Sequence, residues 1–363
     1  MPKHRIIVGI SGGVDSAVAA SLLQKAGHEV EGIFMKNWEE DDNEDYCSAA
    51  EDLSDAEQIC DKLGIMLHTV NFSTEYWDQV FQYFIEEYQV GRTPNPDILC
   101  NTEIKFKAFL DHANGMGADY IATGHYARVK HGHNSAALLS AKDHNKDQTY
   151  FLHGLNQTQL QSALFPLGDL EKPKVRKLAE QLGLPVFDKK DSTGICFIGE
   201  RKFRTFLQQY VSGKPGDIVD EEFNVIGQHQ GSVYYTIGQR SGLGIGGTAK
   251  GSEQPWYVAD KDIENNQILA VQGHDHPKLM HQSLSLEKAH WINSSPKTGH
   301  AYAAKIRYRQ SAQACTISKT TEDQWQIDFT QPQRAITPGQ YAVLYDQEQC
   351  LGGGIIRHRF NLS

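Results

Sequence analysis

The stretch Ile6-Ile7-Val8-Gly9-Ile10-Ser11-Gly12-Gly13-Val14-Asp15-Ser16 decides the fold of the N-terminal part of the chain. Its first five residues are mostly branched and apolar, which predicts a strand buried in a parallel sheet. Two glycines between hydroxyl residues follow, and a helical pattern then runs over residues 16–26 and stops at Gly27. A strand, a glycine turn and a helix in this order aim backbone N–H groups and a helix N-terminus at a phosphate.

The glycine turn has neither the lysine of a Walker A loop nor the spacing of a dinucleotide-binding fingerprint. It resembles the PP-loop of the N-type ATP pyrophosphatases, which cleave ATP between its α and β phosphates and hold pyrophosphate in this loop. Gly12 and Gly13 let the backbone approach an anion closely, and the hydroxyls of Ser11 and Ser16 can donate hydrogen bonds to it. Asp15 could orient a magnesium ion or the loop itself. The alternative is an ordinary glycine turn that caps a helix, and the flanking strand and helix favour the phosphate loop.

Composition sets broad limits on the class of protein. A length of 363 residues predicts two or three domains. No apolar run approaches the ~20 residues of a membrane span, and the N-terminus lacks the apolar region of a signal peptide, so we expect a cytoplasmic protein without a membrane partner. The six cysteines include no CxxC pair, so we expect free thiols and no stable protein metal site. A net charge of −10 argues against a general nucleic-acid binder but leaves room for a local basic groove.

Alternating strand and helix patterns predict an α/β fold, with a doubly wound parallel sheet in the first part of the chain. Strands are expected over residues 30–35, 66–70 and 118–123, and residues 138–141 are expected to continue that sheet region. Met35, at the end of the second strand, is a candidate adenine contact or a core methionine. Gly124 and His125 follow a strand at its carboxyl end, where α/β proteins bind ligands.

Two cysteines lie in unusual segments. Pro94 and Pro96 predict an extended, helix-free segment that ends at Cys100, just before a helix over about residues 102–115. A thiol beside a helix N-terminus has a lowered pKa and favours the reactive thiolate, although a buried structural cysteine is the alternative. Cys196 lies among apolar neighbours in a glycine-bounded stretch, and by itself it indicates a packing residue.

The pattern changes after about residue 203. We expect three domains, over residues 1–203, 204–275 and 276–363: the parallel-sheet domain, a small mixed central domain and an antiparallel β-barrel. Residues 234–247 are so rich in glycine that they predict a mobile loop with one cation, Arg240. Arg307, Tyr308 and Arg309 place two cations around an aromatic ring, which suits a nucleic-acid contact or an exposed strand face.

Five features, in this order, resemble the tRNA-specific 2-thiouridylase family over essentially the whole chain. They are Ser11 to Ser16, Asn95-Pro96-Asp97 with Cys100, Gly124-His125-Tyr126-Ala127, Ser192-Thr193-Gly194-Ile195-Cys196-Phe197 and Tyr235-Thr236-Ile237-Gly238-Gln239-Arg240. The resemblance implies a tRNA 2-thiouridine synthase, an enzyme that adenylates the C2 oxygen of the wobble uridine with ATP, releases pyrophosphate and then replaces that oxygen with persulfide sulfur. It also implies Mg²⁺ with the ATP, tRNAs with Lys, Glu or Gln anticodons, and a sulfur-relay protein or cysteine desulfurase as sulfur donor.

The resemblance also implies roles for individual residues. Cys196 would carry the persulfide, and Cys100 would be the nucleophile that releases sulfide or closes a transient Cys100–Cys196 disulfide. Asp97 would act in general acid/base chemistry or position the base. The implied ATP contacts are Gly9, Ile10, Ser11, Gly12, Gly13, Val14, Asp15, Ser16, Met35 and Gly124. The implied tRNA contacts are Asn95, Pro96, Asp97, His125, Lys146, Asp147, Gln148, Arg307, Tyr308 and Gln340.

Two other functions are compatible with parts of the sequence. An amide-forming PP-loop ligase would share the phosphate loop but would need no cysteine pair. A non-catalytic nucleotide sensor with an RNA-binding barrel would tolerate serine at both Cys100 and Cys196, whereas a sulfurtransferase would lose thiolation in both variants.

Overall fold

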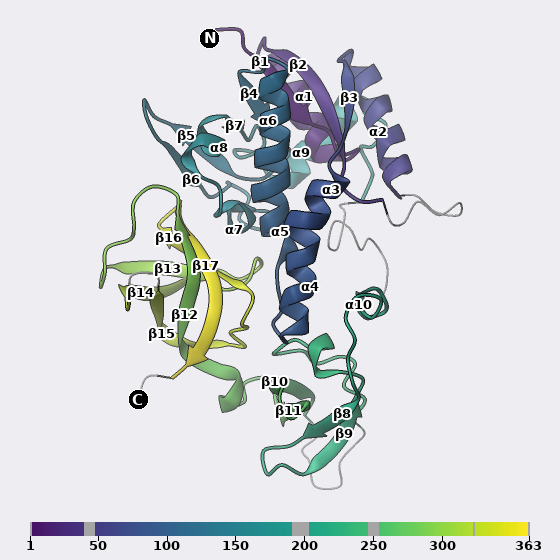
Figure 1. The fold of residues 1–363 in the computed structure, drawn as a ribbon. Helices are drawn as coiled ribbons and strands as arrows, with labels where there is room; N and C mark the ends of the chain where they lie inside the picture. Colours follow the sequence, from purple (N-terminus) through teal and green to yellow (C-terminus); the bar gives the residue numbers. More distant parts are fainter. Residues whose placement is uncertain (1, 40–47, 191–202, 246–253, 322–323, 362–363) are drawn as a thin grey trace.

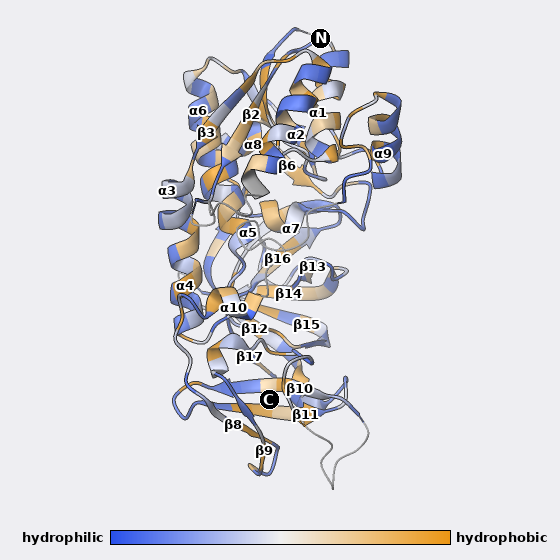
Figure 2. Ribbon diagram, turned by 90° about the vertical axis from the view of Figure 1, so that its right-hand side faces the viewer, coloured by the Kyte–Doolittle hydropathy of each residue, from blue (hydrophilic) through white to orange (hydrophobic). Residues whose placement is uncertain are grey.

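The structure of the chain is a computed structural model, which describes residues 2–39, 48–190, 203–245, 254–321 and 324–361. These residues form a parallel sheet in the order β3-β2-β1-β4-β7, a four-stranded sheet in the order β10-β11-β8-β9, and an eight-stranded sheet that contains a barrel. The parallel sheet lies at one end of the molecule and the four-stranded sheet at the other, with the barrel between them (Figures 1 and 2).

The parallel sheet has helices on both faces, which confirms the predicted doubly wound fold. Ile6 and Val8 of β1 pack into one core with helices α1, α2 and α9, whereas Ile7 packs into the opposite core with α6. The strands are β1 (Arg5–Gly9), β2 (Glu29–Lys36), β3 (Leu67–Asn71), β4 (Tyr120–Ala122) and β7 (Ala163–Leu164), and the helices are α1 (Val14–Lys25), α2 (Ser48–Leu63), α6 (Phe109–Gly115) and α9 (Lys172–Gln181). The strand order reverses between β1 and β4, and in such sheets ligands bind at the carboxyl ends beside the reversal.

A long helical run leads from this sheet toward the four-stranded sheet (Figure 1). It comprises α3 (Ser73–Tyr76), a π-helical turn (Trp77–Phe81) and α4 (Gln82–Gln89). The run is amphipathic, because its buried residues include Tyr76, Phe81 and Phe84 while Trp77 and Val90 are exposed. It ends just before Gly91, whose φ of +76° turns the chain back.

The expectation of a helix-free segment up to Cys100 holds for residues 92–95 and is wrong from Pro96 onward. Helix α5 (Pro96–Leu99) begins six residues earlier than predicted and continues through a π-helical stretch (Cys100–Ala108) into α6. Pro96 occupies the first turn of α5, where its missing N–H costs no hydrogen bond, and Asn95 accepts a hydrogen bond from the Asp97 N–H at 3.2 Å as the N-cap. Cys100 therefore lies inside a helical run, one turn from its start.

The predicted antiparallel barrel is confirmed, since β12 pairs with both β15 and β17 and closes six strands. Its strands are β12 (Met280–Trp291), β13 (Ala301–Lys305), β14 (Gln313–Lys319), β15 (Trp325–Arg334), β16 (Tyr341–Asp346) and β17 (Gln349–Phe360). The expectation that residues 138–141 continue the parallel sheet is wrong. Strands β5 (Arg128–His131) and β6 (Ala136–Leu139) form a hairpin that pairs with the barrel strand β17, with Leu138 opposite Cys350.

The four-stranded sheet comprises β8 (Gly216–Val219), β9 (Val225–His229), β10 (Trp256–Asp262) and β11 (Gln267–Gln272), and it contains both parallel and antiparallel pairs. The prediction of a mobile loop over residues 234–247 is wrong for the described part, residues 234–245. Tyr235 and Ile237 are buried there, and Gly238 has a φ of +83° and lies so close to the barrel that a Cβ would stand 2.7 Å from the Cβ of Ala335. Gly238 therefore allows the central domain to pack closely against the barrel, a role that requires no mobility.

Short helices complete the described chain: α7 (Thr149–Leu152), α8 (Gln157–Gln161), α10 (Phe203–Leu207) and the 3₁₀ turns Ser232–Tyr234 and Pro277–Leu279. Within the described ranges, no helix combines the length and the apolar character that crossing a bilayer requires.

Candidate active site

The glycine turn after β1 forms an anion cradle at the point where the sheet order reverses. Gly13 is the N-cap of α1 and offers no side chain, so the first N–H groups of the helix receive no side-chain cap. The Ser16 hydroxyl donates to the Gly13 carbonyl oxygen at 3.1 Å and accepts from the Ser11 N–H at 3.2 Å, which folds the turn back on itself. Gly12 has a φ of +71°, and a Cβ there would stand 2.4 Å from the carbonyl oxygen of Asp52. These features fit a polyphosphate bound against backbone amides.

Asp15, in the first turn of α1, is held on two sides. The Lys172 ammonium donates to both carboxylate oxygens, at 2.9 and 2.8 Å, and the Tyr126 hydroxyl donates to Oδ1 at 2.8 Å. Lys172 is the first residue of α9, and its side chain is 10% exposed, so this cation lies beside the cradle within the protein. Sequence reasoning missed Lys172 and Tyr126 as site residues, although the position of Lys172 shortly after β7, at the same sheet edge, was a usable signal.

Lys189 is a second cation at the cradle that sequence reasoning missed. Its ammonium donates to the Gly12 carbonyl oxygen at 3.3 Å, to Asp52 at 2.8 Å and to Asp55 at 2.5 Å. Burial opposes its charge, but the hydrogen bonds to Asp52 and Asp55 prevail and raise the pKa of Lys189 above its ordinary value. The lysine thus fastens the chain just ahead of residue 191 to the phosphate loop.

The remaining candidate nucleotide contacts lie along the same sheet edge. Gly9 packs against Met35, whose Cε would stand 3.2 Å from a Cβ at position 9. Gly124 follows β4 and packs on the start of α1, where a Cβ would stand 2.7 Å from the Ser16 backbone nitrogen. Among the residues that the structure describes, no group of three or more His, Cys, Asp or Glu side chains could hold a metal ion.

Cys100 is fully buried at the start of the π-helical stretch. Its neighbour Asn101 donates from Nδ2 to the Phe151 carbonyl oxygen at 3.3 Å, which ties this helix to α7. His125 accompanies the same region: its ring lies 5.8 Å from the Phe106 ring, and its Nδ1 lies 2.8 Å from the Thr123 hydroxyl. Burial and the nearby Lys105 ammonium lower the pKa of His125 well below its ordinary value, so His125 is neutral at pH 7.

The candidate tRNA residues 146–148 form a loop between the cradle and the barrel. Gln148 accepts from the Tyr126 N–H at 2.8 Å and so supports the tyrosine that binds Asp15. Asp147 is buried, and its carboxylate accepts hydrogen bonds from Thr149 and, at 3.0 Å, from the barrel residue Lys305. The side chain of Asp147 thus joins two domains, and only Lys146 and Gln148 of this loop have partly exposed side chains.

The candidate tRNA residues of the barrel lie where the barrel meets the first domain. The Tyr308 ring packs against the Phe151 ring in a tilted arrangement, with 4.4 Å between ring centroids, and the Tyr308 hydroxyl donates to the Lys146 carbonyl oxygen at 3.4 Å. Arg307 is exposed and donates to the Ala335 carbonyl oxygen at 2.6 Å. Gln340 donates from Nε2 to the carbonyl oxygens of Thr93 and Pro94, at 2.7 and 3.1 Å.

Cys196 lies outside the described residues, as does its whole segment 191–202, so its distance from Cys100 is not defined. Hydrogen bonds connect some of the remaining candidates to one another. The phosphate loop, Gly124 and His125 lie at the carboxyl ends of β1 and β4, and residues 146–148 connect that edge to Tyr308 of the barrel.

Three family models match consecutive parts of the chain. A tRNA methyl transferase HUP domain matches residues 4–200, a tRNA methyl transferase PRC-barrel domain matches residues 204–272, and an aminomethyltransferase β-barrel domain matches residues 281–356. The first covers more than half of the chain. The three matches coincide with the parallel sheet, the four-stranded sheet and the barrel.

Curated relatives match over the full length. The tRNA-specific 2-thiouridylase MnmA of Salmonella typhimurium (strain LT2) is 58% identical over 364 residues, covering 100% of this chain and 99% of the relative. The protein of the same name from Escherichia coli (strain SMS-3-5) is 58% identical over 360 residues, covering 99% and 98%. A solved structure, the U34-tRNA thiolase NcsA from Methanococcus maripaludis with its [4Fe-4S] cluster, is 18% identical over 58% of this chain and 65% of its own, with a TM-score of 0.36, too low to carry an argument. On the full-length identity, the chain belongs to the tRNA-specific 2-thiouridylase family.

Proposed function

We propose that this protein is an ATP-dependent tRNA 2-thiouridylase that exchanges the C2 oxygen of a wobble uridine for sulfur. The observation that carries the proposal is the anion cradle at the reversal point of the sheet, in a chain whose relatives of this name match it from end to end. Among the described residues, the site has anion-binding backbone, two lysines and one buried thiol within a single domain.

The first step activates the uridine. The C2 oxygen attacks the α-phosphorus of ATP, the bond to the β-phosphate oxygen breaks, and pyrophosphate leaves. The uncapped N–H groups of α1 and the hydroxyls of Ser11 and Ser16 would stabilise the charge that develops on the leaving pyrophosphate. Met35 and Gly124 would border the nucleotide, and Mg²⁺ would neutralise phosphate charge.

The second step transfers sulfur. Cys196 would carry a persulfide from a donor protein, a cysteine desulfurase or a sulfur relay. In one route, the Cys100 thiolate attacks the Sγ of the Cys196 persulfide, the disulfide closes, and the hydrosulfide that leaves attacks C2. In the other route, the outer persulfide sulfur attacks C2 directly, and the Cys100 thiolate then attacks the Cys196 Sγ and releases the thiolated uridine. Both routes release AMP with the former C2 oxygen and end with a Cys100–Cys196 disulfide, which an external dithiol must reduce.

The substrate would lie between the first domain and the barrel. Asn95 and Pro96 begin the helical run that carries Cys100, and His125 follows β4. From the barrel, Tyr308 contacts Phe151, and Gln340 donates to the carbonyl oxygens of Thr93 and Pro94. Asp97, three residues before Cys100 in the same helical run, would position the base or transfer a proton. The expected substrates are tRNAs with Lys, Glu or Gln anticodons, and the target base must leave its stack to reach the site.

The test is nucleoside mass spectrometry. The protein is incubated with ATP, Mg²⁺, a persulfide donor and an unmodified tRNA that has a wobble uridine, beside a Cys196→Ser control. The proposal predicts 2-thiouridine with the wild type and none with the control. AMP and pyrophosphate without 2-thiouridine would restrict the proposal to adenylation, and the absence of both signals would overturn it.

A further inference from the structure

The chain just ahead of the Cys100 helix is held by all three domains. We call residues 91–95 the strap, because they connect the end of α4 to the N-cap of α5. From the first domain, buried Glu87 pairs with Arg92 through two hydrogen bonds, one of them 2.6 Å long. The strap is thus fixed to α4 at one end. At its other end it leads into the N-cap Asn95 and so sets the position of the helical run that carries Asp97 and Cys100.

The barrel holds the middle of the strap through one short turn, Pro338-Gly339-Gln340. The Thr93 N–H donates to the Pro338 carbonyl oxygen at 3.1 Å, and the Gln340 amide donates to the carbonyl oxygens of Thr93 and Pro94. Gly339 has a φ of +90°, and a Cβ there would stand 2.8 Å from the Thr93 nitrogen. Barrel backbone and strap backbone are therefore in direct contact, with no room for a side chain between them.

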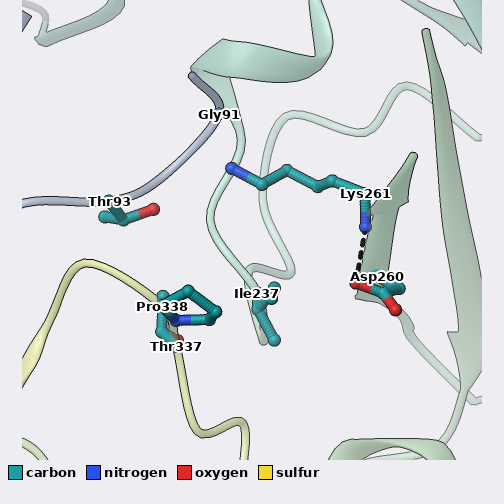
Figure 3. A pocket seen from close by; sticks show the side chains of 7 residues that line it. All are labelled: Gly91, Thr93, Ile237, Asp260, Lys261, Thr337 and Pro338. Atoms are coloured by element: carbon teal, nitrogen blue, oxygen red, sulfur yellow. Dashed lines mark hydrogen bonds between the residues drawn. The ribbon is translucent and has the colours of Figure 1, made fainter. Parts of the chain in front are cut away.

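The central domain holds the strap from the opposite side. The hydroxyl of Thr236 lies 3.3 Å from the hydroxyl of Thr93, and Ile263 packs on Gly91 so closely that a Cβ at position 91 would stand 2.3 Å from its Cδ1. Figure 3 shows the small cavity, about 80 Å³, that remains where the three domains meet, with Thr93, Ile237, Lys261 and Pro338 around it. The Lys261 ammonium donates to the Tyr235 carbonyl oxygen at 2.8 Å and closes the central-domain side of this joint.

We propose that Gln340 is a positioning residue for the catalytic thiol, acting through the strap in concert with Thr236. Both of its N–H bonds reach strap carbonyls, which sets the strap against the barrel and thereby sets the start of the helix that carries Asp97 and Cys100. A shift of the barrel on its substrate would move the strap with it. The inference rests on the proposed function for the role of Cys100, but the strap contacts are tested independently of it.

The test measures how often Cys100 becomes accessible in the RNA-free protein. Iodoacetamide is added to reduced full-length protein, and alkylation of the Cys100 peptide is followed by mass spectrometry, with the buried Cys315 and Cys350 as internal references. Gln340→Leu removes both donors, Gln340→Glu replaces them with acceptors at nearly constant shape, and Thr236→Val removes the second contact. Gln282→Leu is the matched control, because Gln282 also donates to a backbone carbonyl but within the barrel, to Phe329 at 3.1 Å.

We expect Gln340→Leu to alkylate at Cys100 about tenfold faster than the Gln282→Leu control, since each lost neutral hydrogen bond shifts an opening equilibrium by roughly two- to tenfold. Gln340→Glu should exceed Gln340→Leu, and Thr236→Val should show a smaller increase. Thiolation kcat should fall in the same order.

Equal alkylation of Cys100 in Gln340→Leu and in the control, with a weaker Kd for tRNA, would overturn the proposal and leave Gln340 as an RNA contact. A parallel rise at Cys315 and Cys350 would also overturn it, because it would indicate general unfolding of the barrel. If the wild type makes no 2-thiouridine, the proposed function fails, whereas the alkylation comparison still decides the role of the strap.

Discussion

Replacing Lys172 with methionine removes the cation that neutralises Asp15 beside the phosphate cradle. Lys172 donates to both carboxylate oxygens of Asp15 from a side chain that is 10% exposed, whereas Asp15 is 31% exposed and keeps the Tyr126 hydroxyl as a partner. A hydrogen bond to a charged group contributes about 1.5–3 kcal/mol, and Asp15 regains water in the variant, so we expect a loss of about 2 kcal/mol for the pair. For a domain of this size that corresponds to a fall of about 4–8 °C in the Tm of the first unfolding transition.

The same change should weaken ATP binding. Without Lys172, the Asp15 carboxylate presents an uncompensated negative charge in the same turn as the amides that would receive the phosphates. The KM for ATP should therefore rise by about tenfold in a tRNA-dependent AMP-release assay. Lys174→Met is the matched control, because Lys174 lies on the same helix and is exposed. A double variant that adds Asp15→Asn should recover part of the lost stability, since it removes the stranded charge.

Two outcomes would refute this reasoning. If Lys172→Met unfolds at the same temperature as Lys174→Met, the ion pair with Asp15 contributes nothing measurable. If the double variant is less stable than Lys172→Met alone, the effect of Lys172 does not operate through the charge of Asp15.

Three further predictions follow from the site. Cys100→Ser and Cys196→Ser should each abolish 2-thiouridine in nucleoside mass spectrometry yet retain ATP binding, and residual thiolation in either would contradict the sulfur-transfer roles. Ser16→Ala should lower the rate of pyrophosphate release about tenfold with an unchanged far-UV CD spectrum, and loss of the folded spectrum would show that this hydroxyl, which donates to Gly13, is structural. Burial lowers the pKa of Lys261 to about 8, so above pH 8 the unfolded chain binds more protons than the folded protein. The free energy of unfolding of the wild type, measured by denaturant titration, should therefore rise relative to that of Lys261→Met between about pH 7 and 10. A difference that stays constant with pH would contradict the lowered pKa.

The phosphate loop could be predicted from the sequence because its determinants are local. A strand, two glycines and a helix start within eleven residues, and the backbone conformation of Gly12 follows from its lack of a side chain. The position of Gly124 at a ligand-binding sheet edge could also be predicted, because Gly124 directly follows a strand at its carboxyl end, whereas the strand order came only from the structure.

The cations of the site could not be predicted in this way. Lys172 lies 157 positions after Asp15, and Lys189 lies 177 positions after Gly12, so each contact depends on how α9 and the chain beyond it pack against α1 and α2. A lysine in an amphipathic helix gives no sign of which carboxylate it will meet. Pro96 misled for a different reason: proline excludes a helix interior but favours the first turn, and only the Asn95 cap distinguishes the two.

The glycine-rich turn at residues 234–245 shows why composition alone can give the wrong dynamics. Glycine permits both a flexible backbone and close packing of two backbones, and the residues that surround it in the folded protein determine which of the two occurs. Tyr235 and Ile237 are buried, and Gly238 abuts Ala335 of the barrel, contacts that the linear sequence does not contain. The family-typical motif is thus a joint between domains in this structure.

The burial of Cys100 bears on how an enzyme of this kind would protect its chemistry. An exposed thiolate beside a persulfide would form the disulfide without thiolating any uridine, and each such event would consume sulfur and a reductant. Cys100 is fully buried, and its helix begins at a strap that the barrel holds through Gln340. A ligand changes such an equilibrium only through contacts that differ between the two arrangements. A tRNA that touches the barrel at Arg307 and Tyr308 and the helix at Asn95 spans the strap, so its contacts depend on the position of one relative to the other. On the roles proposed above for Cys100 and for the tRNA contacts, bound tRNA would be the group able to shift the strap and expose the Cys100 thiol.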